Sequence, residues 1–147
     1  MSRRSSKGFT LIELLIVVAI IGIIAAIAIP NLLNAIDRGK QKRTMADMRS
    51  VGTAIESYAV DTSKYPIATT LAELLLAVEP IYIKSMPRAD GWTNPLVIVS
   101  IATEYTLSSL GKDNAVATCA AGTTGLFNDD ICFVNGQFAR YPSGVQQ

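Results

Sequence analysis

Two cysteines are the side chains of this sequence with the most distinctive chemistry. Cys119 and Cys132 are the only cysteines, and two thiols cannot complete a four-ligand zinc site. They form either a disulfide in an oxidising compartment or a pair of buried free thiols. The chain has no histidine, the commonest general base and the commonest nitrogen ligand of metals. It also has no GxSxG motif, phosphate-binding loop or recognisable pair of catalytic acids, so we expect that it is not an enzyme.

Glu13 is the second residue of chemical interest, because it lies inside the apolar segment from Phe9 to Ile29. As a helix, this segment would extend for about 30 Å, the thickness of the hydrocarbon core of a bilayer. A charged side chain well inside such a segment costs about 2.5 to 3.5 kcal/mol on insertion scales. Either Glu13 reaches the membrane surface, or it gains a cationic partner.

Basic residues flank the apolar segment on both sides. Three of the 13 basic side chains precede Phe9 and none of the 12 acidic ones do, which favours a cytoplasmic N-terminus. Residues 63–147 contain no basic stripe interleaved with aromatic side chains, so we expect no nucleic acid partner. Basic residues also follow the segment, so charge alone does not fix its orientation. The preceding residues are Arg3, Arg4 and Lys7, and the following ones are Arg38, Lys40, Lys42, Arg43 and Arg49.

A long helix is predicted to continue beyond the apolar segment. Pro30 removes a backbone hydrogen bond, which favours either a bend or local melting, and Gly22 weakens the same stretch. Between residues 31 and 62, apolar side chains such as Met48 and Ile55 recur at steps of three and four residues. This amphipathic pattern predicts a helix that buries one face.

The rest of the chain predicts a small sheet and a second helix. Thr70 and Glu73 have the spacing of a capping box before the apolar stretch LLLAV. Strands are predicted at Leu96–Ile101 and Tyr105–Leu107. The pair Asn135-Gly136 lies between two strand-like runs and is typical of a two-residue hairpin turn. We therefore expect an α+β fold in which part of the long helix packs on a small antiparallel β-sheet.

The N-terminal sequence resembles a known family. A basic leader ending in Gly8, then FTLIE and LLIVVAIIGIIAAIAIP as far as Asn31, resembles the class III signal of type IV prepilins and type II secretion pseudopilins. The resemblance implies that a prepilin peptidase cleaves between Gly8 and Phe9 and that the new Phe9 amine is methylated. This amine is largely cationic and would supply the partner for Glu13 of an adjacent subunit.

The same resemblance implies how the chain is organised. Its segments would be a cytoplasmic leader peptide (1–8), a transmembrane and filament-core helix (9–30), an amphipathic helix of the head (31–62) and a globular pilin-like head (63–147). The stretch from Gly22 to Pro30 would extend on assembly. The subunit would cross the inner membrane once with its head outside the cytoplasm, then enter a periplasmic or extracellular filament. Its partners would be copies of itself, the prepilin peptidase, the inner-membrane assembly platform, minor pilins or pseudopilins, and the membrane.

A looser resemblance concerns the C-terminal loop. DGWTNP, SLGKDN and DDI look like the layout of the major pseudopilin of type II secretion, which holds a calcium ion near the positions of Asp113 and Asp130, with Asp129 adjacent. Here AVATCAAGTTGLFN replaces the family's tight glycine-rich spacing. Either calcium or a Cys119–Cys132 disulfide would then hold the loop. No cofactor is required, and calcium is the one that the resemblance allows.

The expected function is that of a filament subunit. The SLGKDN and DDI layout favours the major pseudopilin of a type II secretion system. The cysteine-bracketed loop favours the alternative, the major pilin of a type IV pilus in adhesion or motility. A membrane-anchored enzyme or binding domain is a remote alternative. A DNA-binding competence pilin is another, and the absence of a basic stripe opposes it.

Overall fold

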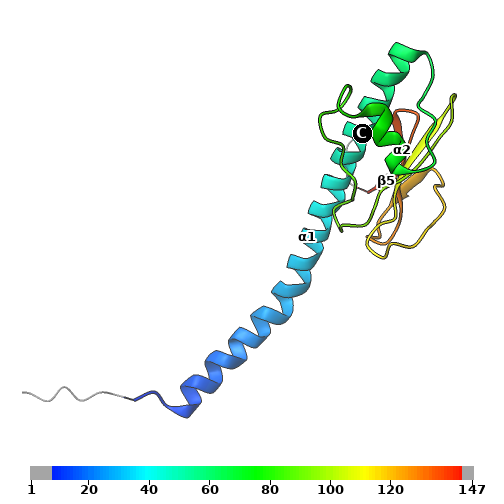
Figure 1. Ribbon diagram of the computed structural model, residues 1–147. Coiled ribbons are helices and arrows are strands. Elements are labelled where there is room, and N and C mark those ends of the chain that lie inside the picture. Colours follow the sequence, from blue (N-terminus) through cyan, green and yellow to red (C-terminus); the bar gives the residue numbers. More distant parts are fainter. Residues whose placement is uncertain (1–7, 144–147) are drawn as a thin grey trace, which may run out of the picture. The chain divides into compact units, whose positions relative to one another are not determined.

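Two helices and five strands follow one another along the part of the chain that the structure describes, residues 8–143 of a computed structural model (Figure 1). The chain divides into two compact units, one up to Ile36 and one from Asp37 onward. We call the second unit the head. The elements are α1 (Leu11–Thr62), α2 (Leu71–Val78), β1 (Val97–Ser100), β2 (Tyr105–Ser109), β3 (Gly122–Thr124), β4 (Ile131–Val134) and β5 (Gln137–Pro142).

The first unit is the N-terminal part of α1, and it is apolar on all sides. Every Leu, Ile and Val between Leu11 and Ile36 is exposed. The most apolar 18-residue window of α1 has a mean hydropathy of 3.1 and no buried residue, so the helix is long and apolar enough to cross a membrane. Helix α1 continues without a break through Gly22 and Pro30.

Helix α1 contributes its second part to the head. Met48, Val51 and Ile55 are fully buried there, as the amphipathic pattern predicts. Gly52 lies on the same face, and a Cβ atom at this position would overlap the ring of Phe133. The glycine therefore lets the backbone of α1 approach the sheet closely. Figure 1 shows α2 and the strands along this part of α1.

The sheet has the strand order β1-β2-β4-β5-β3. Strands β1, β2, β4 and β5 pair antiparallel, as expected. Strand β3 pairs parallel to β5 at the edge of the sheet. The wholly antiparallel sheet predicted from the sequence is therefore corrected to a mixed one. Strand β3 has three residues, begins with a glycine and shows no alternation, so the sequence carries no signal for it.

Local predictions for the turn and the cap are confirmed. Asn135 and Gly136 both have positive φ angles, 46° and 85°, as the two-residue hairpin between β4 and β5 requires. Thr70 and Glu73 form the capping box of α2. The predicted strand ends shift by one or two residues, which is the usual uncertainty of boundaries.

Candidate functional site

The predicted processing site lies at the exposed start of the described chain. Gly8 and Phe9 are outside any helix or strand, and Phe9 is 78% exposed. Residues 1–7 of the expected leader peptide lie outside the described residues. A bond in an exposed, irregular segment can enter an enzyme's active site without unfolding any regular structure.

Glu13 forms a capping box with Thr10 at the start of α1. Its Oε2 accepts hydrogen bonds from the backbone nitrogen of Thr10, at 2.9 Å, and from the Thr10 hydroxyl, at 2.7 Å. The Glu13 nitrogen donates to the Thr10 hydroxyl oxygen at 3.3 Å. Sequence reasoning missed this role although the spacing TxxE carries it. Both donors are uncharged, and no ion pair within residues 8–143 involves Glu13.

At the first residue of the head, Asp37 joins two distant segments of the chain. Its Oδ1 accepts a hydrogen bond from Trp92 Nε1 at 3.0 Å, and its Oδ2 accepts one from Lys112 Nζ at 2.8 Å. The Lys112 hydrogen bond is the main cause that lowers the pKa of Asp37, and burial opposes it. No sequence pattern indicates this contact, because its partners lie 55 and 75 residues away.

The turn around Trp92 docks on the same part of α1. The Gly91 nitrogen donates to the Thr44 hydroxyl at 2.8 Å, and a Cβ atom on Gly91 would lie 2.5 Å from the carbonyl oxygen of Lys40. Asp90 holds the turn by accepting hydrogen bonds from the Trp92 and Asn94 nitrogens and from the Ser109 hydroxyl. This segment of the head is therefore fixed in register against the helix.

The Cys119–Cys132 disulfide is present, so the alternative of two free thiols is wrong. The two Cα atoms are 5.8 Å apart, within the normal range for a disulfide. Cys132 is fully buried in β4, whereas Cys119 lies in the long connection between β2 and β3. The disulfide therefore ties that connection to the middle of the sheet. We call residues 111–131 the cystine loop.

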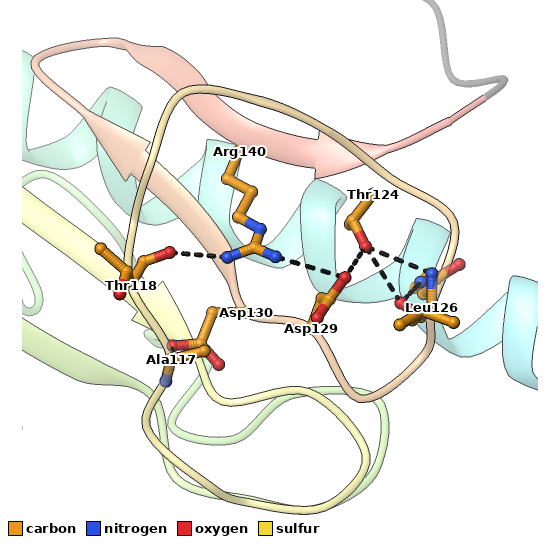
Figure 2. Close-up of polar contacts among 8 residues, drawn as sticks. Ala117, Thr118, Thr124, Leu126, Asp129, Asp130 and Arg140 are labelled. Carbon is orange, nitrogen blue, oxygen red and sulfur yellow. Dashed lines mark hydrogen bonds and ion pairs between the residues drawn. The ribbon is translucent and has the colours of Figure 1, made fainter.

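Each acidic residue considered for calcium uses one of its two carboxylate oxygens in a contact within the protein. Asp113 Oδ1 accepts from the Ala115 nitrogen at 3.1 Å. Asp129 Oδ2 accepts from the Thr124 hydroxyl and pairs with Arg140 (Figure 2). Asp130 is 1% exposed, and its Oδ2 accepts from the Ala117 nitrogen at 2.8 Å.

One oxygen of the loop is buried and without a partner among the described residues, Oδ1 of Asp130. Burial raises the pKa of Asp130, and the carboxylates of Asp113 and Asp129 add to this, against the Ala117 amide and Arg140. Calcium takes six to eight oxygens. Within residues 8–143 no three acidic, Cys or His side chains gather into a metal-holding group.

Comparison with known proteins agrees with the N-terminal motif and the head. Residues 3–29 match the family described as "Prokaryotic N-terminal methylation motif", and residues 31–124 match "Type II secretion system (T2SS), protein G". The second match alone covers more than half of the chain.

Curated relatives carry the name "Type II secretion system core protein G". The protein of Aeromonas hydrophila is 30% identical over 80% of this chain and 91% of its own length. Those of Pseudomonas aeruginosa and Escherichia coli K12 are 32% and 30% identical, over 77% and 76% of this chain and 88% and 86% of theirs. With its apolar N-terminal helix, mixed sheet and these matches, the chain belongs to the type II secretion system protein G family.

Proposed function

We propose that this protein is the major structural subunit of a type II secretion pseudopilus. The observation that carries the proposal is the first unit: an apolar helix exposed on all sides, with one acidic side chain, Glu13, near its start. Such a helix is unstable in water by itself. It suits a subunit that is stored in the membrane and then buries the same surface against other copies.

Processing would supply what Glu13 lacks. Cleavage after Gly8 creates an α-amine on Phe9, and methylation leaves that amine cationic at neutral pH. In a filament the amine of one subunit would pair with the Glu13 carboxylate of its neighbour. Inside an apolar helix bundle an unpaired charge is strongly unfavourable, so the pair would fix the axial position of each incoming subunit.

The segments would then have separate tasks. Residues 1–8 are removed as the leader, 9–30 form the membrane and filament-core helix, 31–62 form the helix of the head, and 63–147 complete the head. Pro30 has no N–H for the helical hydrogen bond to the preceding turn, and Gly22 lowers helix propensity. The stretch between them is where α1 would extend when subunits pack.

The proposed partners follow from this pathway. They are the prepilin peptidase, the inner-membrane assembly platform, other copies of the chain and minor pseudopilins. The subunit would sit in the inner membrane with its head outside the cytoplasm, an environment in which the Cys119–Cys132 disulfide persists. The proposed role is structural, without catalysis and without a required cofactor.

Mass spectrometry of protein sheared from its native cells tests the proposal. We expect a chain that begins at Phe9 and carries one additional methyl group. A chain that begins at Met1, or one cleaved after Ile29, would indicate ordinary anchoring or secretion and would overturn the filament function. The neighbouring genes separate a pseudopilus from a type IV pilus: a secretin together with cargo-specific components would indicate a pseudopilus, and a retraction motor would indicate a pilus.

A further inference from the structure

A fixed cation lies against the cystine loop, the guanidinium of Arg140. Arg140 belongs to β5, where it lies opposite Cys132 of β4 on one side and Gly122 of β3 on the other. Its side chain is 20% exposed. The backbone of Arg140 therefore lies between two paired strands, beside the disulfide.

From there the guanidinium contacts both arms of the loop. Its Nη1 donates to the carbonyl oxygen of Thr118 at 2.6 Å, and its Nη2 lies 3.3 Å from Asp129 Oδ2 (Figure 2). Thr118 directly precedes Cys119, and Asp129 directly precedes the buried Asp130. One planar cation thus joins the two segments that the disulfide joins.

The carboxylate of Asp129 extends this connection to β3. It accepts a hydrogen bond from the Thr124 hydroxyl, whose oxygen also accepts from the Leu126 nitrogen at 3.2 Å. In Figure 2 Arg140 reaches across the loop between Thr118 and the Thr124–Asp129 contact. Two oxygens of the loop, the Thr118 carbonyl oxygen and Asp129 Oδ2, are thus bound by an arginine and are not free for a divalent cation.

We propose that Arg140, together with the Cys119–Cys132 disulfide, closes the cystine loop in place of a bound calcium ion, so that the head is stable without divalent cations. The loop then responds to the redox state of its surroundings, and not to their calcium concentration. This inference concerns the stability of the isolated subunit and does not depend on filament assembly.

Thermal unfolding of the full chain in detergent tests the proposal, measured once with chelator and once with millimolar calcium chloride. We expect the same Tm with chelator and with calcium. A native site at a hundred times its Kd would raise Tm by about 10 °C or more, and such a rise in the unaltered protein would overturn the proposal.

The Arg140→Gln variant tests the arginine itself. Removal of the charge leaves Asp129 unpaired near Asp113 and Asp130, so we expect Tm to fall by about 4 to 8 °C, the equivalent of one net interaction. Calcium should then restore part of the loss, because the carboxylates are no longer neutralised. Arg88→Gln is the matched control, since Arg88 is exposed and makes no ion pair within residues 8–143.

A second variant distinguishes loss of the guanidinium contacts from a general failure to fold. Arg140→Lys keeps the charge but loses the two-armed geometry, and we expect a smaller fall in Tm than for Arg140→Gln with no response to calcium. If Arg140→Gln lowers Tm no more than Arg88→Gln does, the guanidinium does not close the loop and the proposal fails. Equal calcium responses of Arg140→Lys and Arg140→Gln would also contradict it, because charge would then not decide the outcome.

Discussion

The two units of this chain treat similar apolar residues in opposite ways. In the first unit Ile20 is 51% exposed, and the other Leu, Ile and Val side chains of this part of α1 are exposed too. In the head, by contrast, Ile55 is completely buried. Both residues lie on α1. The head buries its hydrophobic surface within one chain, whereas the first unit leaves its apolar surface exposed. A single helix therefore takes part in folding at one end and, at the other, carries the apolar surface that we propose for assembly.

Loss of Glu13 should have the largest effect, and only on assembly. We expect Glu13→Ala to remain in the membrane but to form no filaments in native cells, because the cationic Phe9 amine of a neighbour would have no partner. Electron microscopy of sheared fractions and membrane fractionation measure the two outcomes. Head stability should be unchanged.

Two variants sharpen this prediction. Thr10→Val removes the hydroxyl that donates to Glu13 but leaves the Glu13 carboxylate, so filaments should persist. Glu104→Ala removes an exposed acid of the head and should have no effect. Abundant normal filaments from Glu13→Ala would contradict the proposed role of the carboxylate.

A matched pair of isoleucines tests the contrast between the units directly. Ile55→Ala should destabilise the head by about 2 to 5 kcal/mol, because it opens a cavity between α1 and the sheet. Ile20→Ala removes the same atoms from the first unit and should leave the unfolding of the head unchanged. Urea unfolding in detergent measures both, and equal losses would mean that the units are not independent.

The disulfide should contribute about 3 kcal/mol in the chain-entropy model, because its cysteines are 13 residues apart. We expect the Cys119→Ser, Cys132→Ser double variant to lose this amount and to become insensitive to reducing agents. The unaltered protein with reductant should approach the stability of the double variant. If reductant lowers the stability of the unaltered protein and of the double variant equally, the effect does not come from this disulfide.

The smallest predicted effect concerns acid. The pKa of Asp37 is lower in the folded head than in the unfolded chain, chiefly through Lys112, so its contribution to stability is present above about pH 4. It is lost as the pH falls through the folded pKa. The difference in urea midpoint between the unaltered protein and Asp37→Asn should therefore shrink as the pH falls below about 4.

Glu104→Gln is the control for this titration, since the Glu104 side chain makes no hydrogen bond in the part of the chain that the structure describes. Its urea midpoint should follow that of the unaltered protein at every pH. A difference for Asp37→Asn that stays constant with pH would contradict the lowered pKa.

Features that reside in a few consecutive residues could be predicted from the sequence. The apolar segment from Phe9 to Ile29, the Thr70–Glu73 capping box and the Asn135-Gly136 turn each follow from local preferences of the backbone. The disulfide was one of two alternatives, and the structure decided between them.

Contacts between distant residues could not be predicted in this way. The Trp92–Asp37 and Lys112–Asp37 hydrogen bonds, and the contacts of Arg140 with Thr118 and Asp129, depend on how the strands are ordered. The parallel pairing of β3 is of the same kind. Neither the short strand β3 nor Arg140 carries a local sequence signal. Their contacts become apparent only when the strand order of the sheet is known.

The contact between Trp92 and Asp37 also equips the protein with an optical probe. Trp92 is the only tryptophan of the chain, and its indole nitrogen is bonded to the first residue of the head. Its fluorescence therefore comes from one known place, where α1 enters the head. A red shift of the emission during assembly would report that this junction opens, and an unchanged spectrum would report that any extension of α1 stops before Asp37.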